Sequence, residues 1–189
     1  MTTRHVFIIG SSLEEERPEI NFEIAENSSC VDWLRTSQIL DGKLDVSEYE
    51  TPRLIVHEPD ATNWDFFRCS GTFGIMSKRA VAVLGPFGTG CFDFLPALIN
   101  EQPYCLLRQV GSMDVLDREH TVGKMFPHDP TRFMRITRFA FRKPEISDPC
   151  IFVVPDTGYR IFGTDSIEGV IRSNNFRGFR LVDSEIESK

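Results

Sequence analysis

The sequence predicts an α+β fold, with a mixed or antiparallel sheet and a few packed helices in a single compact domain. Short runs of β-branched and aromatic residues alternate with turn-forming residues along most of the chain, which is typical of strand-rich proteins. Stretches with the apolar spacing of a helix are few and short. The length of 189 residues, with 41% hydrophobic and 26% charged residues, suits one domain that builds its own core.

The first two strands are predicted at residues 5–9 and 53–57. The first is an apolar run closed by glycine and serine, and the second is bounded by Pro52 and Pro59, as strand edges often are. Between these strands, residues 30–40 have the apolar spacing of one or two helical turns.

The clearest helical pattern covers residues 72–84. Its inward-facing apolar residues are Ile75, Met76, Ala80, Val83 and Leu84. The Gly-Pro pair at 85–86 is a typical helix end, because proline cannot continue a helix. Residues 92–98 then lead into a buried strand at 104–107, and the pattern of residues 133–141 favours a strand over a helix.

The last third of the chain is predicted to form a hairpin, a helix and a strand. Residues 150–154 and 159–162 have strand composition and are joined by a Pro-Asp-Thr-Gly turn. Thr164 or Asp165 is expected to cap the helix, its side-chain oxygen accepting a hydrogen bond from an otherwise unpaired N–H. The strand follows at residues 176–182.

Negative charge is concentrated near the N-terminus. Residues 1–60 carry five basic and thirteen acidic side chains, whereas residues 61–189 carry sixteen and fifteen. An acidic surface attracts basic proteins and repels phosphate backbones, so the sequence favours a protein partner with a basic surface over nucleic acid. A solvated acidic face without any partner stays an alternative. The partner-binding residues predicted on this basis are Glu14, Glu15, Glu16 and Glu19.

The same charge distribution suggests how the chain is organised. Residues 1–50 are expected to form an acidic N-terminal part packed on a main domain at 51–183, and residues 184–189 a frayed polar tail.

The cysteines and the apolar runs point to a cytoplasmic protein. The five cysteines lack Cys-x-x-Cys spacing and mostly have apolar neighbours, as buried free thiols do in a reducing compartment. No apolar stretch approaches the roughly 20 residues that cross a bilayer, and the N-terminal apolar run is too short for a signal peptide. We therefore expect no membrane association.

No motif singles out catalytic residues. The glycine-rich loop at 85–90 lacks the Lys-Ser/Thr of a phosphate-binding loop, and Ser70 and Ser77 lack the G-x-S-x-G elbow of hydrolases. No His or Cys pair has metal-ligand spacing. The sequence thus predicts a protein that is not an enzyme and has no cofactor, metal or catalytic residues.

One basic and aromatic segment suggests another kind of partner. Arginines alternate with phenylalanines over residues 132–143, as in proteins that bind single-stranded nucleic acid. The phenylalanines could equally belong to the core, and a face that forms salt bridges with the acidic N-terminal part is the favoured interpretation.

Eight short motifs, in order along residues 50–183, resemble a known family. They are Cys69-Ser70-Gly71, Ile75-Met76-Ser77-Lys78-Arg79-Ala80, Phe94-Leu95-Pro96, Tyr104, residues 114–117, residues 151–156, Phe162-Gly163-Thr164-Asp165 and Asn175-Phe176-Arg177-Gly178-Phe179. In this order they resemble the immunity protein 11 family of bacterial polymorphic toxin systems. The resemblance implies a non-catalytic, antitoxin-like protein that binds and blocks a co-encoded toxin. A small-molecule-binding domain or enzyme, with a cleft beside the 85–90 loop, is the first alternative, and a nucleic-acid-binding protein is the second.

Overall fold

The computed structural model describes residues 5–11, 22–24, 45–57, 63–68, 74–155, 157 and 160–184. Its strands are β1 (Val6–Ser11), β2 (Phe22–Ile24), β3 (Arg53–Val56), β4 (Phe66–Arg68), β5 (Gly74–Ser77), β6 (Phe92–Ile99), β7 (Gln102–Gln109), β8 (Val122–Phe126), β9 (Asp129–Arg138), β10 (Ile151–Val153), β11 (Ile161–Thr164) and β12 (Phe179–Asp183). The α-helices of this part are α2 (Lys78–Leu84) and α3 (Asp165–Ser173), and short 3₁₀ turns lie at Val46–Glu48, Gly85–Gly88 and Lys143–Glu145. The predicted α+β class is confirmed.

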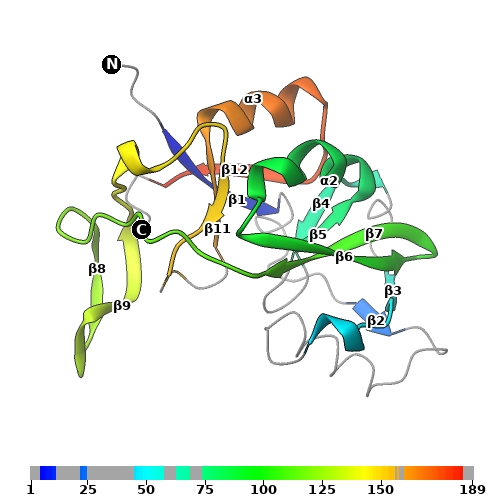
Figure 1. Cartoon of the computed structure of the whole chain (residues 1–189), viewed down its shortest axis with the longest axis horizontal. Helices are drawn as coiled ribbons and strands as arrows, with labels where there is room; N and C mark the ends of the chain where they lie inside the picture. The colour runs from blue at the N-terminus through cyan, green and yellow to red at the C-terminus, as the bar shows by residue number, and fades with distance from the viewer. Residues whose placement is uncertain are drawn as a thin grey trace.

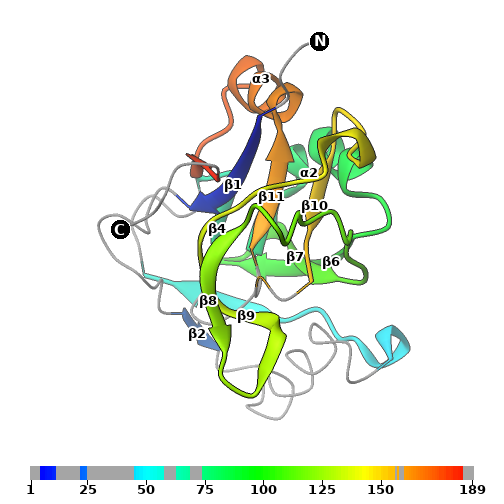
Figure 2. The ribbon, with the colours of Figure 1, turned by 90° about the vertical axis from the view of Figure 1, so that its left-hand side faces the viewer.

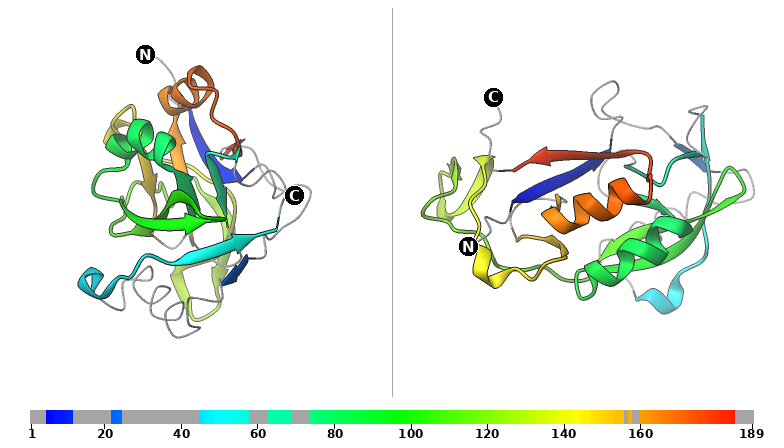
Figure 3. Two further views of the ribbon diagram at one scale, coloured as in Figure 1. Left: turned by 90° about the vertical axis from the view of Figure 1, so that its right-hand side faces the viewer. Right: turned by 90° about the horizontal axis from the view of Figure 1, so that it is seen from above.

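The strands form three sheets along the long axis of the molecule (Figure 1). A six-stranded sheet has the order β2-β3-β6-β7-β5-β4, and a four-stranded sheet has the order β10-β11-β1-β12. The β8–β9 hairpin is a separate two-stranded sheet at the opposite end of the molecule from the β6–β7 turn (Figures 1 and 3). Most pairs are antiparallel, and β3 pairs with β6 in parallel.

Strand β1 joins the beginning of the chain to its end. It lies between β11 and β12, with Phe7 opposite both Gly163 and Asp183. Residues 6–11 therefore belong to the same sheet as the C-terminal third of the chain. Residues 12–21 and 25–44 lie outside the described residues, so the expectation for the rest of the 1–50 segment stays a prediction.

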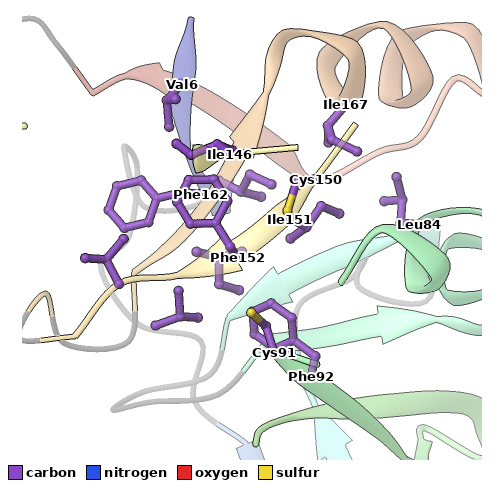
Figure 4. Close-up of a cluster of buried hydrophobic side chains, with 14 of the residues drawn as sticks. Val6, Leu84, Cys91, Phe92, Ile146, Cys150, Ile151, Phe152, Phe162 and Ile167 are labelled. Carbon is purple, nitrogen blue, oxygen red and sulfur yellow. The ribbon is translucent and has the colours of Figure 1, made fainter. Parts of the chain in front are cut away.

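The largest core cluster lies between the four-stranded sheet, helix α3 and the six-stranded sheet. Figure 4 shows Phe152 and Phe162 at its centre, with Ile167 reaching in from α3 and Phe92 from β6. The two central phenylalanine rings are stacked with their centroids 5.6 Å apart. Burying two phenylalanines completely contributes roughly 3–6 kcal/mol of hydrophobic free energy, and this cluster therefore holds the sheets together.

The helix predicted at 72–84 begins later than the sequence indicates. Residues 74–77 form β5 instead, and Ile75 is paired with Leu106 of β7. Helix α2 begins at Lys78, where the hydroxyl of Ser77 accepts a hydrogen bond from the Ala80 N–H at 3.1 Å. The prediction was wrong for this segment because a run as short as Gly-Ile-Met-Ser fits either element, and the strand partner decides between them.

Three further details differ from the sequence prediction. Thr164 precedes α3, but its hydroxyl is not a helix cap: it donates to the Asp148 carboxylate at 2.5 Å. The last strand begins at Phe179 rather than 176, because Gly178 has a φ of +89° that no strand accommodates. Ser184 does not fray with the predicted tail: it is buried, and its backbone N–H donates to Val6 O at 3.3 Å.

Candidate protein-interaction surface

The β8–β9 hairpin is fixed to the molecule by one buried face. Phe133 and Ile136 are 6% and 4% exposed and belong to the main core cluster. Residues three apart normally face opposite sides of a strand. Here the register shifts between Lys124 and Met125, so that Met134 is an extra residue of β9. Because of this bulge, the side chains of Phe133 and Ile136 both point inward. The hairpin is therefore part of the core on one side.

The other side of the hairpin exposes large apolar side chains. Val122, Phe126 and Met134 are 36%, 41% and 44% exposed, and Val110 is the fourth large hydrophobic residue exposed in the described part of the chain. Isolated exposed apolar residues are common, but three on one short hairpin are a local concentration of apolar surface, and protein interfaces are often found at such places. Figure 2 shows the hairpin in the foreground, toward the viewer.

The same hairpin is basic in an acidic protein. It carries Lys124, Arg132, Arg135 and Arg138 against the single acidic residue Asp129, although the whole chain has a net charge of -7. The guanidinium of Arg132 lies 5.7 Å from the centre of the Phe126 ring, within the range of a cation–π contact. Apolar and cationic groups are thus combined on one exposed surface.

Arg160 extends this basic region toward the start of β11. It is half-buried, with its guanidinium 5.3 Å from the centre of the Phe139 ring. Burial and the nearby cations of Arg68 and Arg135 lower the pKa of Arg160 below its ordinary value. An unfavourable environment for a positive charge favours the approach of an anionic group.

In residues 132–143, the segment considered as a nucleic-acid contact, the phenylalanines are buried and several arginines are exposed. Phe133, Phe139 and Phe141 are all buried in the core, so they offer no stacking surface for bases. Arg142 belongs to a local turn, where its Nε donates to the Glu145 carboxylate at 2.8 Å. The core interpretation of the phenylalanines is confirmed. The predicted binding residues Glu14, Glu15, Glu16 and Glu19 lie outside the described residues.

The β8 part of this surface was not predicted from the sequence, whereas Arg132 and Arg135 on β9 belong to the basic segment at residues 132–143. Val122, Lys124 and Phe126 lie on β8, a strand whose residues are mostly exposed, so the apolar alternation that marks a half-buried strand is missing. Lys124 and the arginines of residues 132–138, on either side of the Pro127-His128 turn, are the signal in the sequence.

The glycine-rich loop at 85–90 packs against the core. Its first part is the 3₁₀ turn Gly85–Gly88, and a Cβ atom added to Gly88 would lie 3.1 Å from the Phe92 ring. The adjoining cavity, between the two sheets, is wholly apolar and has a volume of about 10 Å³. A cavity of this size holds at most one water molecule, so it is not the ligand cleft considered from the sequence.

A larger groove lies between α3 and the edge strand β12. Its volume is about 490 Å³, within the range of small-molecule sites. Phe7, Phe179 and Leu181 line it from the sheet, and the Glu168–Arg172 ion pair, with an Nη2–Oε1 distance of 2.6 Å, lines it from the helix. The groove is therefore the candidate ligand site of the described residues.

The described residues have neither a side-chain cluster suited to a metal ion nor a membrane-spanning helix. They contain no group of three His, Cys, Asp or Glu side chains arranged to hold a metal ion. None of the helices in this part is long and apolar enough to span a membrane.

Comparison with protein-family models gives no match, and comparison with curated proteins gives none either. The resemblance to the immunity protein 11 family therefore stays a prediction from the short motifs.

Proposed function

We propose that this chain is a non-catalytic immunity protein, which binds and blocks a co-encoded bacterial toxin in the cytoplasm without a cofactor. The motif order along residues 50–183 supports the toxin-system role. The observation that carries the binding role is the exposed apolar and basic surface of the β8–β9 hairpin. Aromatic residues, methionine and arginine are enriched at protein interfaces, and this surface presents all three.

A growth-protection assay tests the proposal. The toxin domain encoded beside this chain is placed under an inducible promoter, and the chain is co-expressed at graded levels. Protection is expected to rise until the two proteins reach an equimolar ratio, because occlusion requires one inhibitor for each toxin. An enzyme that repairs toxin damage would protect well below that ratio, and such a result would contradict a non-catalytic role.

Affinity capture supplies the second measurement. The tagged chain should retain the toxin domain in a stoichiometric complex. The double variant Phe126→Ser/Met134→Ser should retain much less, because buried interface anchors each contribute about 1–3 kcal/mol. The matched control is Val110→Ser, which removes an equally exposed apolar side chain outside the hairpin. An equal loss in both variants would contradict a contact at the hairpin.

A second candidate function is supported by the α3–β12 groove. A small amphipathic molecule could place its apolar part on Phe179 and Leu181 and its polar groups near Arg172. A ligand that binds only the native state raises the melting temperature, so thermal-shift screening of metabolites would find it. The shift should disappear in Leu181→Arg and persist in Phe126→Ser.

A further inference from the structure

Two like charges face each other across the β8–β9 hairpin. Lys124 is the direct partner of Arg135 in the strand ladder, and both side chains are exposed. Like charges placed directly opposite one another destabilise an antiparallel pair. Within the described residues neither side chain has an ion-pair partner. The pair therefore lowers stability unless something negative binds to it.

The surroundings of this pair add more positive charge. Arg135 lies close enough to Arg160 for charge repulsion to lower the pKa of Arg160, and Arg68 on β4 has the same effect. Arg138, the partner of Val122, continues the row of cations along β9. The cations thus come from β4, β9 and the start of β11, and the tertiary structure brings them together.

The edges of the hairpin are poorly suited to pairing with another strand. Pro130 has no N–H to donate, Pro127 lies in the turn, and the register shifts interrupt β9. Prolines, bulges and exposed lysines are the features that protect sheet edges against pairing. A partner would therefore contact the side-chain surface, where Phe126 and Met134 lie beside the cations.

We propose that this surface, defined by Lys124, Phe126, Met134, Arg135 and Arg160, binds an acidic patch with apolar side chains on a partner protein. This proposal adds a binding surface to the proposed immunity function. It rests on that function only for the identification of the partner as the toxin. Carboxylates on the partner would relieve the repulsion between Lys124 and Arg135, so charge complementarity favours an acidic partner surface. The partner surface is then acidic, whereas the N-terminal glutamates predict a basic one.

Nucleic acid carries the same negative charge but fits this surface less well. The net charge of -7 repels an extended polyanion at long range, and Phe126 is the one exposed aromatic ring of the hairpin because Phe133 is buried, so a series of stacking rings is missing. The chain's own acidic residues Glu14, Glu15, Glu16 and Glu19 are another possible occupant. The test separates these two alternatives from a partner protein.

The probe is a fluorescein-labelled peptide of about 16 residues with the repeat Glu-Glu-Leu-Glu, measured by anisotropy with the full chain. We expect saturable binding at about 20 mM salt, weakened at least about tenfold at about 200 mM. The Lys-Lys-Leu-Lys peptide should not bind. Arg135→Glu should weaken binding of the acidic peptide at least about tenfold, and the matched charge reversal Lys78→Glu, at an exposed position on α2, less than about twofold.

Stability supplies an independent readout. Arg135→Glu should raise the melting temperature by about 1–3 °C, because it turns a repulsive cross-strand pair into an attractive one. A site retained for binding is expected to gain stability when its binding charge is removed. A lower melting temperature for Arg135→Glu would overturn the role given to the like-charge pair.

The remaining outcomes are also decisive. Tighter binding of a thymidine oligonucleotide than of the acidic peptide would overturn the proposal in favour of nucleic acid. At least about tenfold tighter peptide binding by the variant Glu14→Lys/Glu15→Lys/Glu16→Lys/Glu19→Lys would show that the chain's own glutamates occupy the surface. Peptide binding without growth protection would leave this surface established and refute the immunity function.

Discussion

The guanidinium of Arg79 donates two hydrogen bonds to the carboxylate of Asp65, from Nε at 3.1 Å and from Nη2 at 2.6 Å. The same carboxylate accepts hydrogen bonds from the Ser77 hydroxyl at 2.7 Å and from the Arg177 N–H at 2.9 Å. Arg79 also lies over the Phe176 ring, 4.9 Å from its centre. One buried acid thus connects β4, β5 and α2 to the turn that leads into β12.

Replacing Asp65 with alanine should destabilise the fold strongly. Its carboxylate is almost fully buried, and its removal leaves the Arg177 N–H and the Ser77 hydroxyl without an acceptor. We expect a loss of about 2–4 kcal/mol in the free energy of unfolding, measured by urea titration. Asp93→Ala, which removes an exposed carboxylate 3.5 Å from Arg108, should cost less than about 1 kcal/mol. Equal losses would contradict the role of the Asp65 junction.

The same residue should make stability depend on pH in the acidic range. Burial alone would raise the pKa of Asp65, but hydrogen bonds from Arg79, Arg177 and Ser77 outweigh it and lower the pKa below 3.8. The unfolded chain therefore binds a proton at a higher pH than the folded chain does. The stabilisation is complete above about pH 4–5 and is lost as the pH falls further.

Urea midpoints measured from pH 6 to about pH 2.5 would test this dependence. Asp65→Asn should start from a lower midpoint and fall less steeply than the native chain. Some slope will remain, because hydrogen bonds from His120 and Thr131 also lower the pKa values of Asp117 and Asp129. An unchanged slope in Asp65→Asn would show that Asp65 does not contribute.

Two glycines should respond in opposite directions to alanine. Gly178 has a φ of +89°, and a Cβ atom there would lie 2.0 Å from Phe66 O, so Gly178→Ala should cost about 2–4 kcal/mol. Gly169 lies in α3 with open space around its Cα, and Gly169→Ala should add about 0.5–1 kcal/mol through helix propensity. In thermal unfolding, the melting temperature should fall for Gly178→Ala and rise for Gly169→Ala. Destabilisation by Gly169→Ala would mean that the helix is crowded there.

Thr164 offers a test of buried hydrogen bonding. Its hydroxyl accepts a hydrogen bond from the Cys150 N–H at 3.1 Å while it donates to Asp148. Thr164→Val preserves the shape of the side chain but leaves this N–H without an acceptor, which should cost about 1–3 kcal/mol. Thr89→Val, at an exposed turn position, should cost less than about 0.5 kcal/mol by the same denaturant titration. A neutral Thr164→Val would contradict this assignment.

Local patterns predicted the elements that carry their own turn signals. The strand β3 lies between prolines in the sequence, the sequence Pro-Asp-Thr-Gly separates β10 from β11, and α3 has the apolar spacing of a helix. All were confirmed within a few residues, because side-chain period and turn chemistry act over short distances. Of the motif residues with core character, Met76, Leu95, Tyr104, Phe152 and Phe162 are buried, whereas Phe94 is only half-buried against the core.

Elements that depend on distant partners were missed. The run at 74–77 became a strand because β7 supplies hydrogen bonds to it, and β8 escaped prediction because its residues are mostly exposed. The candidate surface shows the same limit. The opposition of Lys124 and Arg135 follows from the hairpin register, and the approach of Arg160 follows from the packing of β11.

The sequence by itself determined the α+β class, the apolar residues of the core and the uneven distribution of charge. These properties follow from the amino-acid composition and from the spacing of apolar residues along short stretches of the chain. The tertiary structure alone decided that the phenylalanines of the 133–141 segment turn inward while the neighbouring arginines turn outward. The physical reason is that a shift of strand register changes which side chains are buried, and the phenylalanines are buried against core residues that lie far away in the chain.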